Sequence, residues 1–420
     1  MDTIYVTWGI SALAVFGVIT RPFGLPEAIW AVAGALALLA SGLIGVGDAW
    51  AGIAKGTDVY LFLIGMMLLS ELAHREGLFD WLAALATQKA KGSPLRLFVL
   101  IYAVGILVTV FLSNDATAVV LTPAVYAATR AAKLKNPMPY LLICAFIANA
   151  ASFVLPISNP ANLVIFGGGT MPPLSKWLAT FALPSLVAIA VTFAMLYWSQ
   201  RREILTETLA RQIDAPVLSH SAKLAGYGLL FTAVILMTAS ALDVDLGLPT
   251  FVAGVLTTVL VLALTRRGPG ETLKGVSWSV LPLVGGLFVL VEALDKTGLT
   301  HQLASLLQHY AAADAPATAM SAGLLVGFVS NLVNNLPAGL MAGTTVQAAH
   351  VSGSVSAAVL IGVDLGPNLS VTGSLATILW LSALKREGLH MGPWAFLKIG
   401  AVVMIPALLL SLAALVLTVG

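Results

Sequence analysis

Apolar residues occur along this chain in long stretches that are separated by short polar segments. The first two stretches, residues 4–20 and 25–45, are each close to the ~20 residues that an α-helix needs to cross a bilayer. Similar stretches recur to the end of the chain, so the pattern predicts an all-α polytopic membrane protein. The predicted spans are residues 4–20, 25–45, 59–74, 138–166, 176–198, 222–241, 248–266, 277–294, 354–384 and 393–418.

Two further apolar stretches, residues 95–133 and 316–350, are each interrupted near the middle by a polar cluster. The clusters are SND at residues 113–115 and NLVNN at residues 331–335. Each stretch therefore predicts two half-helices that meet at a polar tip. Such a unit either crosses the membrane twice or enters and leaves on one side as a re-entrant hairpin, which is stable where its tip lines a cavity.

The distribution of basic residues decides between these two arrangements. If both stretches are re-entrant, the loops alternate so that Lys and Arg collect on one side of the membrane. Of the 21 basic residues, only Lys55, Lys176, Lys296 and Lys398 then lie elsewhere. The positive-inside rule makes the basic side cytoplasmic and places both termini outside. We therefore predict ten spans and two re-entrant hairpins.

The composition excludes most soluble functions. Only 10% of the residues are charged and 59% are hydrophobic, whereas roughly a quarter are charged in an ordinary soluble domain. No hydrophilic stretch is long enough for a nucleotide-binding or catalytic domain, and nothing predicts a nucleic-acid partner. Residues 1–6 lack the basic start of a signal peptide, so the first span is predicted to be retained. The short amphipathic segment 78–90 is predicted to lie along the cytoplasmic interface.

The two halves of the chain carry the same landmarks in the same order. GMMLLSELAHREGL matches GGLFVLVEALDKTGL, and a glutamate, Glu71 or Glu292, stands six residues before a Gly-Leu pair in each. The hairpin tips then align, as do polar breaks at residues 148–160 and 362–374. Five spans per half is an odd number, so the second half is predicted to be inverted, as in many secondary transporters. The alternative is a chance match between apolar segments. The predicted units are a first repeat (1–200), a cytoplasmic linker (201–221) and a second repeat (222–420).

Four acidic residues fall inside predicted spans or hairpins: Glu71, Asp115, Glu292 and Asp364. An ionisable group inside a membrane is costly and marks a functional hypothesis. Asp115 stands at the first hairpin tip and Asp364 at a helix break, so both are predicted to face a central cavity and to carry protons. The alternative for each is a carboxylate that caps a half-helix. Glu71 and Glu292 lie near span ends and are predicted to be structural.

Neutral polar side chains form the second group of candidates. They converge if the two repeats face each other, and their hydroxyls and amides suit a small solute that is neutral or singly negative. No basic residue maps to this cavity, which argues against citrate or phosphate as cargo. The alternative is that these groups only satisfy unwound backbone. The candidates are Ser113, Asn114, Thr117, Ser158, Asn159, Asn162, Asn334, Asn335, Asn368, Ser370, Thr372, Ser374 and Thr377.

Cysteine and histidine do not predict a metal centre. The single cysteine, Cys144, lies in a span and is predicted to be a small core residue, because one thiol cannot form a polythiolate site. All six histidines fall in loops or at span ends. We therefore predict neither a cofactor nor a bound metal.

The run IGVDLGPNLSVTGSLATILWLSALKREG at residues 361–388 closely resembles the signature of ArsB-type arsenite/antimonite efflux permeases of the ion transporter superfamily. FLSNDATAVVLTP, ISNPANLVIF and NLVNNLPAGL resemble further blocks of that family in the same order. The resemblance implies efflux of trivalent arsenic or antimony hydroxides, driven by protons alone or with a soluble ATPase subunit. It also implies an elevator motion of a transport domain against a scaffold, and it admits a homodimer. The site residues that it implies are Ser113, Asn114, Asp115, Asn159, Asn334, Asn335, Asp364, Asn368, Thr372 and Ser374.

The sequence therefore predicts a proton-coupled arsenite or antimonite efflux carrier in the bacterial inner membrane. A related carrier of another solute stays open, such as a sodium/proton antiporter or a carrier of silicic acid or anions. An intramembrane protease would need a nucleophile motif with an embedded histidine or paired aspartates, and neither is evident. A passive channel is disfavoured, because paired helix breaks in inverted repeats are typical of alternating access.

Overall fold

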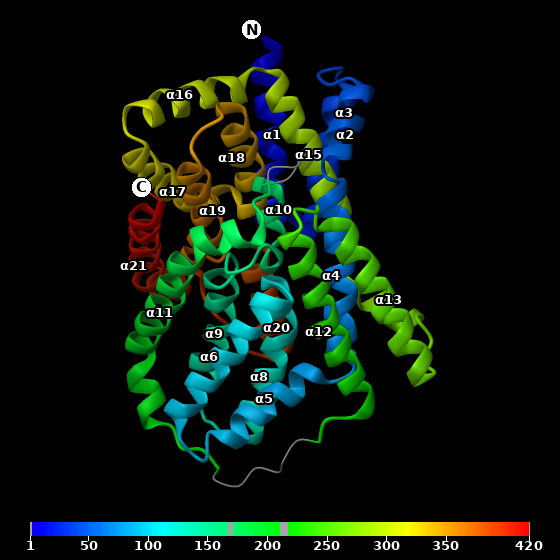
Figure 1. The fold of residues 1–420 in the computed structure, drawn as a ribbon, viewed down its shortest axis with the longest axis vertical. Coiled ribbons are helices and arrows are strands. Elements are labelled where there is room, and N and C mark those ends of the chain that lie inside the picture. The colour runs from blue at the N-terminus through cyan, green and yellow to red at the C-terminus, as the bar shows by residue number, and fades with distance from the viewer. Residues whose placement is uncertain (1, 167–170, 211–216, 420) are drawn as a thin grey trace.

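The computed structural model describes residues 2–166, 171–210 and 217–419, and every regular element within them is helical (Figure 1). Eight helices of the described chain are long and apolar enough to cross a membrane, and three more are apolar but shorter. The protein is therefore a multi-pass membrane protein, as the apolar pattern predicts.

The elements fall into two halves with the same order. The first half consists of α1 (Asp2–Thr20), η1 (Pro22–Gly24), α2 (Glu27–Ala40), α3 (Val46–Lys55), α4 (Thr57–Arg75), α5 (Leu78–Lys89), α6 (Pro94–Phe111), α7 (Asn114–Ala116), η2 (Thr117–Leu121), α8 (Thr122–Ala131), α9 (Met138–Ala150), η3 (Pro156–Ser158), α10 (Pro160–Phe166) and α11 (Leu174–Thr206). The second half consists of α12 (His220–Ala241), α13 (Gly247–Thr265), α14 (Gly270–Gly275), α15 (Val280–Lys296), α16 (Leu299–Ala313), α17 (Ala315–Val333), α18 (Asn335–Ala349), α19 (Gly353–Leu365), η4 (Gly366–Leu369), α20 (Leu375–Arg386) and α21 (Pro393–Val419).

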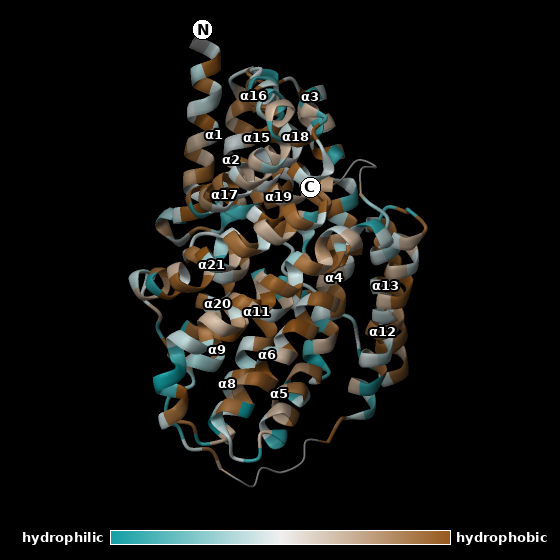
Figure 2. Ribbon diagram, turned by 60° about the vertical axis from the view of Figure 1, so that its left-hand side comes forward, coloured by the Kyte–Doolittle hydropathy of each residue, from teal (hydrophilic) through white to brown (hydrophobic). Residues whose placement is uncertain are grey.

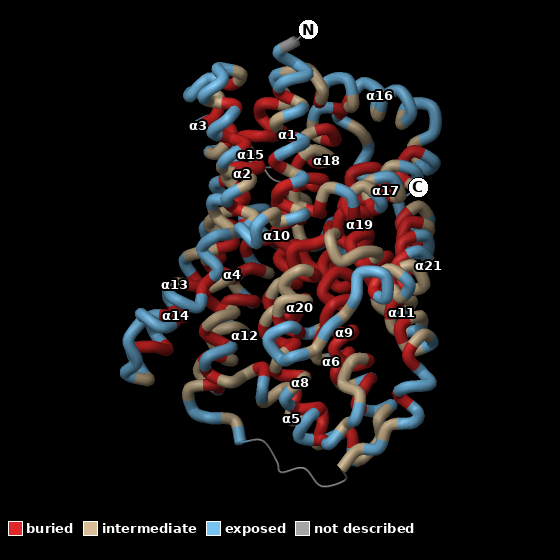
Figure 3. The backbone as a smooth tube through the Cα atoms, turned by 180° about the vertical axis from the view of Figure 1, so that it is seen from behind, coloured by how far each residue is buried: buried red, intermediate tan, exposed pale blue. Residues whose placement is uncertain are grey.

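Matched elements of the two halves make matched contacts. Helix α4 packs along α13, and their counterparts α15 and α2 pack along each other. The amphipathic helices α5 and α16 follow α4 and α15, and they lie at opposite ends of the molecule in all three views of the whole chain (Figures 1, 2 and 3). The hairpins and broken helices of both halves lie between these two ends.

The same local sequence devices begin the same elements in each half. Helices α5 and α16 each follow a glycine with positive φ, Gly77 (75°) and Gly298 (83°), a conformation that favours glycine. The hairpins then begin with a side-chain cap. Ser93 accepts a hydrogen bond from the third residue of α6 (3.3 Å), and Asp314 accepts one from the third residue of α17 (2.9 Å). A proline stands in the first turn of both helices.

The core of the protein is the pair of broken helices. Every residue of α9 after Met138 is buried, as is every residue of α19 after Gly353 (Figure 3). In contrast, α12 and α13 carry exposed large apolar side chains, including Phe231 and Leu256. Figure 2 shows that much of both helices is coloured hydrophobic. Outward apolar side chains are expected of helices that face lipid, because the membrane interior is as apolar as they are.

Two features differ from the predicted spans. Helix α11 has 33 residues and runs to Thr206, well past the predicted end of the span at residue 198. The residue that follows this extension holds the loop before α9, since Glu207 accepts hydrogen bonds from the backbone N–H groups of Lys135 (3.0 Å) and Asn136 (2.8 Å). The second difference is that α3, α14 and α16 are additional helices, which are too short or too amphipathic to register as spans.

Glycines at the contact of α17 with α19 and η4 provide a test of this packing. A methyl group on Gly362 would overlap the backbone of Gly323. We expect Gly362→Ala to lower the unfolding temperature in detergent, because overpacking costs about 1–3 kcal/mol and exceeds the ~1 kcal/mol that alanine gains in a helix. Gly9→Ala is the control, since nothing lies within 4 Å of its added methyl group. An unchanged transition for Gly362→Ala would contradict the close approach of these helices.

Candidate functional site

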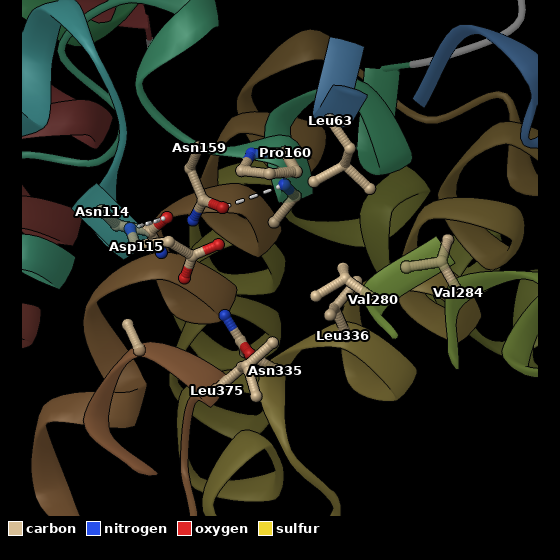
Figure 4. Close-up of a pocket in the computed structure, with 12 residues that line it drawn as sticks. Leu63, Asn114, Asp115, Asn159, Pro160, Val280, Val284, Asn335, Leu336 and Leu375 are labelled. Carbon is tan, nitrogen blue, oxygen red and sulfur yellow. Dashed lines mark hydrogen bonds between the residues drawn. The ribbon is translucent and has the colours of Figure 1, made fainter. Parts of the chain in front are cut away.

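The polar breaks of both halves meet around one small cavity of about 20 Å³. Its polar lining consists of Asn114 and Asp115 from the first hairpin, Asn159 from the first helix break and Asn335 from the second hairpin (Figure 4). Figure 4 shows the carboxylate of Asp115 and the amide of Asn335 pointing toward each other across this space. Four of the predicted site residues therefore converge.

Apolar side chains close the cavity on the side of α4 and α15. These are Leu63 on α4 and Val280 and Val284 on α15. The polar groups all come from hairpins and broken helices, whereas this wall comes from continuous helices. The cavity thus lies at the boundary between two kinds of element.

The tip of the first hairpin leaves the carboxylate of Asp115 free. Ser113 caps the tip by accepting a hydrogen bond from the backbone N–H of Ala116 (3.1 Å), and Asn114 Oδ1 accepts one from the N–H of Asp115 (2.9 Å). No residue that the structure describes donates a hydrogen bond to the Asp115 carboxylate. The alternative that Asp115 is the helix cap is therefore wrong, because Ser113 takes that role.

A π turn, η2, follows this tip. Thr117, its first residue, is completely buried and shares a hydrogen bond with the hydroxyl of Thr109 on α6 (2.8 Å). π turns are rare and occur mostly within α-helices, frequently at functional sites. Thr117 joins the two arms of the hairpin and does not line the cavity, which differs from its prediction as a substrate ligand.

The tip of the second hairpin is built differently. Asn334 has a φ of 71°, its Nδ2 donates to the carbonyl of Thr372 (3.1 Å), and its Oδ1 accepts from the N–H of Leu336 (3.3 Å). The backbone N–H of Asn335 donates to the carbonyl of Gly373 (2.8 Å). Asn334 therefore fastens the tip to the second helix break. Asn335 is left to face the cavity, with an Oδ1 that has no partner among the described residues.

At the first helix break, Asn159 connects the cavity to Asp364. Its Oδ1 accepts from the N–H of Ala161 (3.0 Å) and its Nδ2 donates to Asp364 Oδ1 (2.7 Å). Ser158 does not reach the cavity, because its hydroxyl donates to the carbonyl of Val110 (3.0 Å). Hydrogen bonds at both the oxygen and the nitrogen of its amide therefore fix the orientation of the Asn159 side chain.

Asp364 lies behind the cavity and not in its wall. It occupies the last turn of α19 and is 0% exposed. Its second oxygen, Oδ2, has no hydrogen-bond partner among the described residues. This position differs from the prediction that Asp364 faces the cavity, and it also excludes the capping alternative, since the residue ends a helix and does not begin one.

The other predicted ligands in the second break hold unwound backbone. Asn368 donates to the carbonyl of Phe146 (2.9 Å) and accepts from Asn149 (2.9 Å). Thr372 donates to the carbonyl of Asn331 (3.0 Å), and Ser374 caps α20. These side chains follow the alternative reading, in which polar groups in a break replace lost helical hydrogen bonds.

The residue that the sequence interpretation passed over is Asn331. Its Nδ2 donates to the carbonyls of Gly327 and Gly366, both at 2.9 Å, and its Oδ1 accepts from the N–H (3.0 Å) and hydroxyl (2.8 Å) of Ser370. It therefore ties the second hairpin to the second break. The sequence feature that could have identified Asn331 is its position as the first residue of the NLVNN cluster.

Positive charge is kept away from the cavity. Lys176 is exposed, and Lys398 is exposed with its Nζ 5.6 Å from the ring centre of Trp394. Glu71 and Glu292, predicted to be structural, each form an ion pair at 2.6 Å, with Arg75 and Lys55 respectively. None of the residues that line the cavity is Lys or Arg.

Metal chemistry finds little support in the described part of the chain. No group of three His, Cys, Asp or Glu side chains in it is placed to hold a metal ion. Cys144 is 0% exposed within α9, in line with its prediction as a core residue.

Comparisons with known proteins agree with a transporter. A family model described as citrate transporter (CitMHS) matches residues 12–363. The arsenical pump membrane protein of Escherichia coli is 28% identical over 425 residues, which covers 97% of each chain. An uncharacterized transporter of Mycobacterium tuberculosis is 27% identical over 374 residues, 85% of each chain. In structure, the chain resembles the YdaH transporter of Alcanivorax borkumensis, with a TM-score of 0.57, 13% identity, and coverage of 88% of this chain and 86% of that one. At that identity the structural likeness concerns the fold alone.

Proposed function

This chain belongs to the citrate transporter (CitMHS) family and is a membrane transporter and not an enzyme; from that premise we propose that it exports arsenite or antimonite from the cytoplasm in exchange for protons. The observation that carries the proposal is the character of the cavity: three amides and one free carboxyl, with no cation. Relatives that are similar over 97% of the chain are named arsenical pump membrane proteins.

The cavity suits arsenous acid better than citrate. Arsenous acid is a small neutral hydroxide at pH 7, and it needs hydrogen-bond donors and acceptors and no counter-charges. The amides of Asn114, Asn159 and Asn335 supply both kinds of group. A citrate trianion would meet the Asp115 carboxylate and no Lys or Arg, and like charges placed together in a water-poor site are strongly unfavourable. The family's name therefore does not fix the cargo of this member.

The architecture supports alternating access. We propose that the two halves are inverted repeats, with α1–α11 and α12–α21 as the repeated units. The hairpins and broken helices would form a transport domain that slides against a scaffold of α1–α4 and α12–α15, with α5 and α16 as arms at its two ends. On this proposal the basic loops lie in the cytoplasm of a bacterial cell and both termini lie outside.

The transport cycle needs one group that binds a proton on one side and releases it on the other. Asp115 is the candidate in the cavity, and Asp364 acts on the cavity through Asn159. Exchange of a neutral solute for a proton carries positive charge inward, so both the pH gradient and the membrane potential would drive it.

Flux in proteoliposomes that hold the purified protein alone tests the proposal. We expect an imposed gradient of one pH unit to accelerate arsenite or antimonite transport about tenfold over the flux without a gradient, because a tenfold difference in proton activity is worth ~1.4 kcal/mol. The potential is clamped with potassium and valinomycin so that the pH gradient acts by itself. Citrate is the comparison solute. Gradient-driven citrate flux without arsenite or antimonite flux would contradict the proposed cargo.

A further inference from the structure

A second cavity continues from the candidate site along α4. It measures about 80 Å³, and Asp115 lines both spaces. Its other polar lining includes Ser113 at the hairpin tip and Ser70 and Glu71 on α4. A cavity needs roughly 10–15 Å³ to hold one water molecule, so this space accommodates several. The carboxyl of Asp115 therefore stands between the binding cavity and a chamber large enough for a chain of water.

A smaller space lies beside the second hairpin tip. This space, lined by Glu27 and Asn334, measures about 10 Å³. That is roughly the room for one water molecule. The larger of the two spaces, on the α4 side, is the one that Asp115 lines.

Glu71 lines the larger chamber together with Asp115. Its side chain is 13% exposed, and its Oε1 accepts a hydrogen bond from Arg75 Nε at 2.6 Å. Arg75 Nη1 in turn donates to Glu271 Oε2 on α14 at 3.0 Å. A Cβ on Gly275 would collide with the Glu71 carboxylate, so α14 closes directly over it. Glu71 therefore lies where the chamber wall on α4 meets α14.

The matched glutamate of the second half lacks this chamber. Glu292 is paired with Lys55 at 2.6 Å and approached by Gly52 of α3, much as Glu71 is paired with Arg75 and approached by Gly275. However, Glu292 is not among the residues that line the three cavities at the site. Each half therefore has a glutamate in an ion pair, and of the two only Glu71 lines a cavity that Asp115 also lines.

The partner of Glu71 in its ion pair also pairs with a second carboxylate. Arg75 is shared between Glu71 and Glu271, so neither carboxylate holds it exclusively. The next ion pair along the helix joins Glu76 to Arg267 at 3.0 Å. The other titratable groups on α4 at this end and on the elements packed against it include His74, Asp80 on α5, His220 and Lys223 on α12, Arg266 at the end of α13 and Lys274 on α14.

We infer that the chamber from Asp115 to Glu71 is the proton exit of this transporter and that Glu71 is its terminal relay; this rests on the proposed proton exchange. The O–H bond of a protonated Asp115 breaks, the proton moves along water in the chamber, and an O–H bond forms on the Glu71 carboxylate. Glu71 then releases the proton to water beside α14, and no other reactant is consumed. The α14 end carries the basic loops, so the exit is cytoplasmic on the proposed topology.

Matched glutamine variants test the relay. We expect Glu71→Gln to reduce pH-driven arsenite flux at least about tenfold, because it keeps the size of the side chain but removes proton transfer. Exchange of labelled arsenite at equal pH on both sides should remain within about twofold of wild type, since it needs no net proton release. Glu292→Gln removes an equivalent ion pair and should leave both fluxes unchanged. Equal losses in the two variants, or full pH-driven flux in Glu71→Gln, would overturn the inference.

Cysteine accessibility tests the chamber without any transported solute. The native Cys144 is 0% exposed and should not react with a charged thiol reagent, so the protein supplies its own background. Ser70→Cys and Val119→Cys, on opposite walls of the chamber, should react when the reagent is added from the cytoplasmic side. Val291→Cys, the position matched to Ser70, should not.

The two experiments fail in different ways. If wild-type protein moves no arsenite but Ser70→Cys and Val119→Cys are labelled, the proposed cargo is wrong and the hydrated chamber stands. If arsenite moves and neither cysteine reacts, the chamber is not a water passage and the assignment of Glu71 falls.

Discussion

Asp115→Asn is expected to abolish pH-driven flux while the protein folds normally and still exchanges arsenite. The carboxyl of Asp115 faces both cavities and accepts no hydrogen bond from the described residues, so its replacement by an amide breaks no contact that holds the hairpin tip. Capping is unaffected because Ser113 supplies it. The variant loses the ability to bind and release a proton at position 115. We expect a reduction of about 10²-fold, the lower end of what a positioned proton-transfer group contributes.

The measurement compares net flux under a pH gradient with labelled exchange at equal pH. Asp80→Asn serves as control, because Asp80 is an exposed aspartate on α5 away from the cavity. If Asp115→Asn retains the full response to a pH gradient, the proton path avoids the first hairpin tip. Loss of exchange together with net flux would instead identify Asp115 as a ligand of the solute itself.

Two replacements of Asp364 are expected to separate its role in stability from its role in proton coupling. Asp364→Leu removes the acceptor for Asn159 Nδ2 and leaves a buried donor unpaired, which costs about 1–3 kcal/mol. We therefore expect a lower unfolding temperature in detergent. Asp364→Asn can turn its carbonyl toward Asn159 and keep that hydrogen bond, so its unfolding temperature should stay near that of wild type.

The flux of Asp364→Asn is the informative quantity. An ionised carboxylate that is 0% exposed is costly unless a partner stabilises it, and Oδ2 of Asp364 has none among the described residues. A change in its protonation would therefore reach the cavity through Asn159. We expect pH-driven flux to fall about tenfold, equivalent to ~1.4 kcal/mol. Full pH-driven flux with normal folding would make Asp364 a purely structural anchor for Asn159.

Much of the fold follows from the apolar pattern alone. The predicted hairpin at residues 95–133 compares with helices from Pro94 to Ala131, and the broken helix at 354–384 with helices from Gly353 to Arg386. These limits are sharp in the sequence because capping residues and prolines stand beside long apolar runs. Helix α16 was missed, since an amphipathic helix on a membrane surface lacks the continuous apolar run of a span.

The site was predicted less completely, for a geometric reason. Polar residues at a helix break mark the break, but their spacing does not tell which side chains turn toward the cavity. Asn334 and Asn335 are neighbours, yet one binds the backbone of the second break and the other faces the cavity. Ser158 and Asn159 show the same ambiguity, since Ser158 binds the backbone of Val110 and Asn159 lines the cavity and binds Asp364. Only the packing of the two halves against each other resolves it, and that information is spread over the whole chain.

The π turn at Thr117–Leu121 bears on how the two hairpins should be aligned with each other in evolutionary comparisons. A π turn accommodates one residue more than the α-helical turn it replaces, and α18 continues from its tip as an uninterrupted α-helix. The residue that the π turn adds therefore belongs within 117–121, in the arm that follows the tip. A gap is also needed before the tip, because Ser93 and Asp314 stand 221 positions apart (314 − 93) whereas Asp115 and Asn335 stand 220 apart (335 − 115). Only with both adjustments does an alignment keep the position at which one hairpin holds a titrating group and the other an amide.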